Sequence, residues 1–113
     1  MTSTPRLANR KALIVGATTP DGIGVTIARR YRAEGASIAI AGLEVDETAS
    51  IAAELDATFV PMDVLDQASI ENGVAAAREA LGGLDIMANA AGVNRACLIS
   101  EEDAEGLTFL ARL

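Results

Sequence analysis

Apolar residues along the chain follow two alternating patterns. Short runs that are apolar at nearly every position indicate strands buried on both faces, and the segments between them carry apolar residues at helical spacing. This alternation of strand and helix predicts an α/β fold, with a parallel sheet, right-handed crossovers and helices on both faces. The expected strands are 11–15, 37–41, 58–62 and 84–88, and the expected helices are about 24–34, 46–55, 66–81 and 100–113.

Individual residues mark the ends of these elements. Gly35 can adopt the left-handed backbone conformation that terminates a helix, and Gly82-Gly83 ends the third helix. Asp66 is placed to cap the N-terminus of that third helix. Pro61 cannot donate a backbone hydrogen bond, so the third strand either lies at an edge of the sheet or ends at this residue.

Composition narrows the class of protein. At 113 residues the chain forms at most one domain, and no apolar run approaches the length of a membrane span. A net charge of −7 and a pI near 4.4 argue against binding to nucleic acid or to an anionic membrane surface. Cys97 is the only cysteine, and residues 1–10 contain no secretory signal. We therefore expect a cytoplasmic protein with a flexible leader over residues 1–10.

The turn between the first strand and the first helix contains three glycines, Gly16, Gly22 and Gly24. A strand that ends in such a turn and leads into a helix directs several backbone N–H groups towards one point. That point lies at the positive end of the helix dipole and suits a phosphate group. A glycine pattern of this kind also occurs in ordinary tight turns, so by itself it leaves both interpretations open.

Four motifs, in order, resemble those of the short-chain dehydrogenases/reductases, a Rossmann-fold family that uses NAD or NADP. They are VGATTPDGIG, similar to the family's TGxxxGIG turn, then Asp63-Val64, then GGLDI, and finally NAAG at 89–92, similar to NNAG. The resemblance implies a doubly wound parallel sheet with strand order 3-2-1-4. Complete family members are much longer, so residues 11–113 are expected to form an incomplete dinucleotide-binding domain.

The resemblance also implies which residues bind the dinucleotide. Asp63 is expected to contact adenine rather than to cap a helix, because Asp66 is better placed for the cap. Asn89 and Gly92 either shape the floor of the site or stabilise the end of the fourth strand. The full set of candidate cofactor-binding residues is Gly16, Thr18, Gly22, Ile23, Gly24, Leu43, Asp63, Val64, Asn89, Ala90 and Gly92.

Departures from the family pattern bear on the choice of cofactor. Gly16 and Gly22 are six residues apart rather than four, so Pro20-Asp21 is an insertion beside the expected pyrophosphate position. Asp21 would repel a 2′-phosphate, and the turn contains no arginine or lysine to receive one. NAD is therefore favoured over NADP. Glu44 lies where an acidic residue would bind the adenosine ribose, but a solvated charge explains it equally well.

The family's catalytic tyrosine and lysine, which belong to a YxxxK segment, have no counterpart in this sequence. The only tyrosine, Tyr31, lies in the first helix, and Gly35 stands where the motif requires lysine. The only lysine, Lys11, begins the first strand at the wrong end of the sheet. We therefore expect the cofactor-binding half of an NAD(P)-dependent oxidoreductase, inactive alone, with no catalytic residue and no metal site. The alternative is a non-catalytic interaction module that pairs with itself or with a full-length relative.

The fourth strand is expected at an edge of the sheet, with no fifth strand to cover it. Its residues 86–88 are apolar and uncharged, and natural proteins normally blunt or cover such an edge. The last helix adds Leu107, Leu110 and Leu113, with little sheet against which to bury them. We therefore expect self-association through the fourth strand and the last helix.

Overall fold

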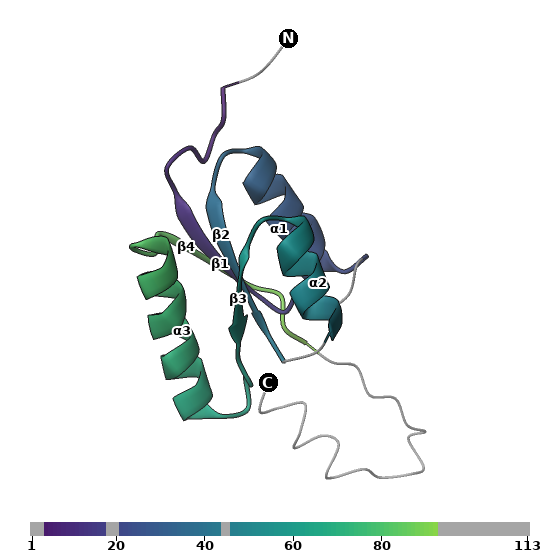
Figure 1. The fold of residues 1–113 in the computed structure, drawn as a ribbon, viewed down its shortest axis with the longest axis vertical. Coiled ribbons are helices and arrows are strands. Elements are labelled where there is room, and N and C mark those ends of the chain that lie inside the picture. Colours follow the sequence, from purple (N-terminus) through teal and green to yellow (C-terminus); the bar gives the residue numbers. More distant parts are fainter. Residues whose placement is uncertain (1–3, 18–20, 44–45, 93–113) are drawn as a thin grey trace, which may run out of the picture.

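Four parallel strands form the centre of the computed structural model, which describes residues 4–17, 21–43 and 46–92 (Figure 1). The strands are β1 (Lys11–Val15), β2 (Ser37–Gly42), β3 (Thr58–Pro61) and β4 (Ile86–Asn89), and they lie in the order β3-β2-β1-β4. The predicted parallel sheet and its strand order are confirmed. Because the strands run the same way, their carboxyl ends meet at one end of the sheet.

Three helices cover the faces of this sheet, with α1 (Ile23–Ala33) and α2 (Asp46–Glu54) on one side and α3 (Gln67–Leu81) on the other (Figure 1). Each helix begins at the carboxyl end of the sheet and returns to the amino end, as crossovers between parallel strands require. None of these three helices is long and apolar enough to cross a membrane. Cys97 and the helix predicted for 100–113, with its three leucines, lie outside the described residues.

Alternate residues of the central strands enter two separate apolar layers, because successive side chains of a strand point to opposite faces. On one side, Ile14 and Ile40 belong to a buried cluster with Val25 of α1. On the other side, Leu13 belongs to a cluster with Ala77 of α3. The strands β1 and β2 are buried over almost their whole length, as their continuous apolar runs predicted.

The residues predicted to end the helices do so. The Asp66 side chain accepts hydrogen bonds from the backbone N–H groups of Ala68 and Ser69 at the start of α3. Gly35, just beyond α1, has a φ of +95°, and Gly82, after α3, has a φ of +76°. Both values lie in the region that glycine adopts without strain, which explains why the helices end there.

Four strand boundaries differ from the prediction. β4 begins at Ile86 rather than at residue 84 and ends at Asn89 rather than at residue 88, because its pairing with β1 runs from Ala12–Ile86 to Val15–Asn89. β2 extends to Gly42, where it pairs with Pro61. β3 ends at Pro61, so Met62 lies just outside the strand, although its N–H still donates to the Gly42 carbonyl at 2.8 Å. In each case the neighbouring strand sets the limit.

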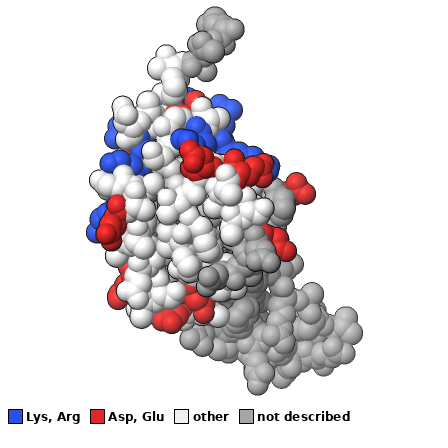
Figure 2. All heavy atoms as spheres, in the orientation of Figure 1, with Lys and Arg blue, Asp and Glu red and all other residues white. Residues whose placement is uncertain are grey.

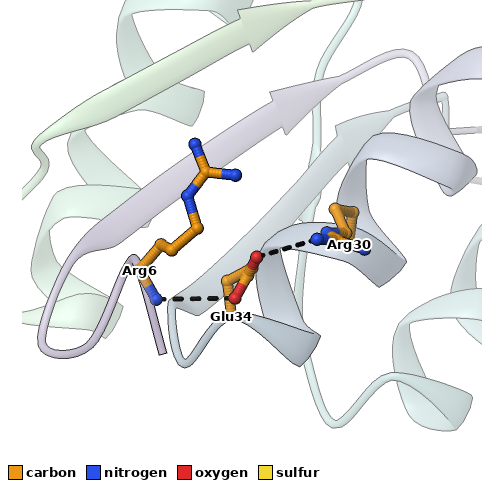
Figure 3. Close-up of polar contacts among 3 residues, drawn as sticks. All are labelled: Arg6, Arg30 and Glu34. Atoms are coloured by element: carbon orange, nitrogen blue, oxygen red, sulfur yellow. Dashed lines mark hydrogen bonds and ion pairs between the residues drawn. The ribbon is translucent and has the colours of Figure 1, made fainter. Parts of the chain in front are cut away.

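The residues before β1 contact the end of α1, which the sequence pattern did not predict. The Leu7 N–H donates to the Glu34 carbonyl at 2.8 Å, and the Arg6 N–H donates to Glu34 Oε1 at 3.5 Å. The other carboxylate oxygen of Glu34 accepts a hydrogen bond from the Arg30 guanidinium at 3.0 Å (Figure 3). Leu7 also packs against the core cluster on the α1 side, so this segment closes the amino end of the sheet.

Candidate functional site

The candidate site lies at the carboxyl end of the sheet, where the turns that follow the strands meet. The Gly16 N–H donates to the Ala41 carbonyl at 2.9 Å, and the Ala90 N–H donates to the Val15 carbonyl at 2.7 Å. These two bonds join the ends of β1, β2 and β4. The glycine turn and the NAAG segment, which are far apart in the sequence, are therefore neighbours in space.

Gly16 occupies a conformation and a space that only glycine fits. Its φ is +98°, in a region that side-chain-bearing residues rarely adopt. A Cβ atom at Gly16 would be 2.5 Å from the Ala91 nitrogen and 2.7 Å from the Ala90 carbonyl carbon. The first glycine of the turn thus allows the end of β1 to approach the backbone that follows β4.

The second and third glycines shape the beginning of α1. A Cβ atom on Gly24 would be 2.8 Å from the Gly16 carbonyl oxygen, so glycine here lets the helix start directly against the end of β1. Gly22 is the N-cap and makes no side-chain hydrogen bond to the first N–H groups of the helix. Such N–H groups have no partner within their own helix. They lie at the positive end of α1, which is the geometry that binds a phosphate.

Two large apolar side chains are exposed near this helix N-terminus. Ile23, the first residue of α1, is 76% exposed, and Leu43, just after β2, is 59% exposed. Apolar side chains at a helix N-terminus and a strand end can pack against the flat ring of a ligand, as in most small-molecule sites. Thr18, another candidate of the first turn, lies outside the described residues.

Asp63 stands in the turn after β3 and has a partner that the sequence analysis missed. The Asp63 N–H donates to the Ser69 hydroxyl at 2.8 Å, and its Oδ1 accepts from the Leu65 N–H at 3.0 Å. One carboxylate oxygen therefore closes the turn, and the other can still accept a hydrogen bond. Val64 packs against the core on the α3 side. A serine in the first turn of the following helix was the signal that could have indicated this contact.

Asn89 ends β4, and its side chain stabilises the segment that follows. Its Oδ1 accepts a hydrogen bond from the Ala91 N–H at 3.1 Å, which supports the strand-end role. The amide NH₂ group of Asn89 remains able to donate to a ligand. Ala90 is half-buried, whereas Gly92 is exposed, and no described atom lies within 4 Å of its Cβ position. Against the described residues, Gly92 makes no close backbone contact of the kind that requires glycine at Gly16.

Comparison with known proteins identifies the relatives of this chain. The family model for enoyl-(acyl carrier protein) reductase matches residues 16–109. The chain belongs to the short-chain dehydrogenase/reductase family. The 2,5-dichloro-2,5-cyclohexadiene-1,4-diol dehydrogenase LinX of Sphingobium indicum is 40% identical over 106 residues, which are 89% of this chain and 42% of that protein. A 2-dehydro-3-deoxy-L-rhamnonate dehydrogenase (NAD(+)) of a Sphingomonas species is 37% identical over 92 residues, 80% of this chain and 36% of that protein.

Solved structures agree on the fold. The crystal structure of a short chain dehydrogenase from Mycobacterium smegmatis matches with a TM-score of 0.91 at 22% identity, over 99% of this chain and 49% of that one. This likeness supports the doubly wound arrangement described above. The chain thus spans less than half the length of these members of the short-chain dehydrogenase/reductase family.

Charge is distributed unevenly between the two ends of this family member. At the carboxyl end, the described parts of the turns contain Asp21, Asp63 and Asp66 and no basic residue. On the face that Figure 2 shows, the described Lys and Arg lie over the upper and middle parts of the molecule, and the charged residues coloured below them are Asp and Glu. The described basic residues lie before or at the start of β1 and in the C-terminal halves of α1 and α3: Arg6, Arg10, Lys11, Arg29, Arg30, Arg32 and Arg78.

The two residue types on which the family's proton transfer depends lie away from the candidate site. Tyr31 packs against the core near the C-terminus of α1. Lys11 begins β1, and its Nζ donates to the Gly82 carbonyl at 3.1 Å at the amino end of the sheet. No tyrosine–lysine pair therefore lies at the candidate site within residues 4–17, 21–43 and 46–92. The same residues contain no group of three or more His, Cys, Asp or Glu arranged to hold a metal ion.

Proposed function

We propose that this chain binds NAD at the carboxyl end of its sheet and forms the cofactor-binding half of an oxidoreductase. The observation that carries the proposal is the N-terminus of α1, whose N-cap residue is a glycine without a capping side chain and which Gly16 and Gly24 set against the end of β1. Backbone N–H groups gathered at the positive end of a helix suit the negative charge of a pyrophosphate. Membership of a family that uses NAD or NADP supports the same assignment.

The other candidate residues would surround the rest of the dinucleotide. Ile23 and Leu43, both exposed, would pack against its rings. The Asp63 carboxylate, whose Oδ1 accepts from the Leu65 N–H, would accept a hydrogen bond from the adenine amino group through its other oxygen. The Asn89 amide would line the nicotinamide side together with the segment that follows β4. By this assignment, each turn at the carboxyl end supplies one part of the site.

The charges around the site support NAD rather than NADP. A 2′-phosphate is normally received by an arginine or lysine close to the adenosine ribose. The described part of the carboxyl end contains no such residue, and Asp21 in the first turn would repel the additional negative charge. The name of the Sphingomonas relative also specifies NAD. We expect the dissociation constant for NADP to exceed that for NAD.

We propose that the 113-residue chain binds the dinucleotide in the cytoplasm without transferring hydride. Tyr31 and Lys11 are its only tyrosine and lysine, and both are committed to contacts away from the carboxyl end of the sheet. A proton-transfer group must come within hydrogen-bond reach of its substrate. Incubation with NAD and a panel of secondary alcohols should therefore produce no NADH fluorescence. Robust turnover by the pure chain that disappears in Lys11→Ala would contradict this proposal.

The experiment that tests binding is thermal unfolding with and without nucleotide. At a hundredfold excess over its dissociation constant, NAD should stabilise the chain by about 2.7 kcal/mol, and NADP should do so only at higher concentration. Gly22→Arg should abolish the stabilisation, because its side chain would enter the space assigned to the pyrophosphate. The φ of −79° at Gly22 is accessible to any residue, so backbone strain would not explain the loss.

The matched control is Ala75→Arg, which introduces the same charge at an exposed position of α3. Ala75 lies on the opposite face of the sheet from α1, so this variant should retain the NAD shift. The binding proposal is overturned if millimolar NAD and NADP leave the melting temperature of the native chain unchanged. It is equally overturned if Gly22→Arg retains the full shift.

A further inference from the structure

A pocket at the amino end of the sheet lies outside the candidate NAD site. It has a volume of about 170 Å³ and is lined by Arg6, Leu7, Arg30, Tyr31 and Glu34. The first two residues belong to the segment before β1, and the other three belong to the C-terminal part of α1 and its cap. A cavity of about 150 Å³ is large enough to hold benzene. The pocket therefore has room for a small ring or a branched chain.

The wall that the segment before β1 contributes is held by hydrogen bonds at both of its ends. The Leu7 N–H donates to the Glu34 carbonyl at 2.8 Å, and the Ser37 N–H donates to the Arg10 carbonyl at 2.9 Å. Between these two anchors, the Arg10 N–H donates to the Leu7 carbonyl at 3.0 Å and closes a turn. A ligand would find this wall already in place, which lowers the cost of ordering it on binding.

Gly35 allows this segment to lie directly against the end of α1. Its φ is +95°, and a Cβ atom there would be 3.1 Å from the Pro5 Cβ and 3.2 Å from the Ala8 Cα. These distances are tighter than ordinary van der Waals contact, so a larger residue would push the segment outwards. The wall of the pocket thus depends on a glycine that also ends the helix.

The charged groups of the pocket are not all paired with one another. Glu34 Oε1 accepts from the Arg6 backbone N–H at 3.5 Å and Oε2 from the Arg30 guanidinium at 3.0 Å, and the Glu34 side chain is 12% exposed. Figure 3 shows the Arg6 guanidinium directed away from this carboxylate. It forms no ion pair with any residue of the described part of the chain. Arg30 uses only Nη2 on Glu34. Two guanidinium groups with donors to spare therefore border a carboxylate that already has its partners.

The balance of charge at the pocket is positive. Glu34 and the C-terminal end of the α1 dipole both oppose an anion, and the dipole contributes roughly half an elementary charge. The two full charges of Arg6 and Arg30 outweigh them together. A guanidinium group binds a carboxylate through two parallel hydrogen bonds, which makes this the anion that the pocket suits.

We propose that this pocket binds a small monocarboxylate with an apolar body, such as a ring or a branched chain. Its carboxylate would bind Arg6 and Arg30 at the rim. Its body would pack against Leu7 and the ring of Tyr31, which are both partly buried against the core. Inorganic phosphate would leave these two apolar surfaces without a contact, and an ammonium ion would be repelled by both arginines.

The fluorescence of Tyr31 provides a direct test, because the chain contains one tyrosine and no tryptophan. Cyclohexanecarboxylate, which does not absorb at the excitation wavelength, should change this fluorescence with saturation in the millimolar range, and added salt should weaken its binding. Cyclohexylmethanol carries the same ring without the charge and should require about tenfold more or higher concentration. The absence of a saturable response to the carboxylate, or equal responses to the two compounds, would overturn the proposal.

Matched variants separate this pocket from a general attraction between charges. Arg6→Met keeps the apolar stem but removes the guanidinium, and it should weaken carboxylate binding by about tenfold or more. The control is Arg10→Met, which removes the same charge from an exposed position of the same segment that does not line the pocket. It should leave the affinity nearly unchanged. Equal losses in the two variants would overturn the proposal.

Glu34→Gln should have the opposite effect. It removes the negative charge beside the ligand, and its amide oxygen can still accept from the Arg6 N–H, so carboxylate binding should become severalfold tighter. Weaker binding in this variant would overturn the proposal. The Gly22→Arg variant, altered at the other end of the sheet, should bind the carboxylate as the native chain does. The result is therefore independent of whether the chain binds NAD.

Discussion

The two ends of this sheet are built from the same strands and helices but are held together in different ways. At the amino end, side chains make the connections. Lys11 Nζ donates to the Gly82 carbonyl at 3.1 Å, the Lys11 N–H donates to Asp85 Oδ2 at 2.9 Å, and Arg32 pairs with Asp56 at 3.1 Å. At the carboxyl end, the backbone itself makes the close contacts, through glycines such as Gly16.

This difference reflects the direction of the helix dipoles. The helices α1 and α3 end at the amino end of the sheet, where arginines complement the negative end of each dipole. At the carboxyl end the helices begin, and the N-cap residue of α1 is Gly22, which has no side chain to cap the helix. Side chains therefore join separate elements at the amino end, whereas among the described residues Asp63, Asp66 and Asn89 at the carboxyl end bond only to residues a few positions away. Substitutions at the carboxyl end of the sheet should therefore affect NAD binding. Substitutions at the amino end should affect the free energy of unfolding and not NAD binding.

The largest expected effect comes from Gly16→Ala. Its added Cβ atom would lie 2.5 Å from the Ala91 nitrogen, at a φ of +98°. Strain and displacement of the backbone together should cost about 3 kcal/mol or more in the free energy of unfolding, and NAD stabilisation should be lost. Gly92→Ala is the control, because its Cβ atom would meet no described atom, and it should be nearly neutral in denaturant unfolding. If both variants lowered the free energy of unfolding by the same amount, the close approach of Gly16 to the backbone after β4 would be contradicted.

A smaller effect is expected from Lys11→Met, which keeps the apolar stem but removes the Nζ bond to the Gly82 carbonyl. The loss of one solvent-exposed hydrogen bond should lower the free energy of unfolding by about 0.5–1 kcal/mol. NAD should still raise the melting temperature by the same increment as in the unmodified chain. A smaller rise in melting temperature on adding NAD would show that the amino end of the sheet influences the ligand site. It would contradict the view that the two ends act independently.

The smallest effect is expected from Arg29→Gln. Arg29 and Glu54 form an ion pair at 3.5 Å, and both side chains are largely exposed. Exposed pairs of this kind contribute about 0–1 kcal/mol, and added salt screens them. The free energy of unfolding should change by less than about 0.5 kcal/mol, and the small difference should disappear at high salt. A larger change would show that the surface charges between α1 and α2 hold the helices in place.

Much of the fold was predictable because its signals are local. Asp66 and Gly82 enclose α3, and Gly35 ends α1, since a cap or a positive φ depends on residues a few positions away. The apolar residues at helical spacing in α2 and α3 include Ile51 and Ala77, and both are buried in the core. A continuous apolar run predicts a strand covered on both faces, and β1 and β2 fit that expectation.

The boundaries of the strands and the contacts of the site were less predictable. The start of β4 was misplaced because Leu84 is as apolar as the strand that follows, and only the register with β1 excludes it. The contacts of Glu34 with the residues before β1 join segments whose patterns give no sign of each other. Such pairings depend on how the elements dock.

The sequence by itself determined the order of the strands and helices, the residues that end the helices, and the family to which the chain belongs. It did so because hydrophobic period, capping residues and glycine turns act over a few residues at a time. Only the tertiary structure decided that Gly16 touches the backbone after β4, that Lys11 donates to the Gly82 carbonyl at the amino end, and that the Met62 N–H donates to Gly42 beyond the end of β3. These features depend on which backbone groups face each other across parallel strands, and that register exists only once the sheet has formed.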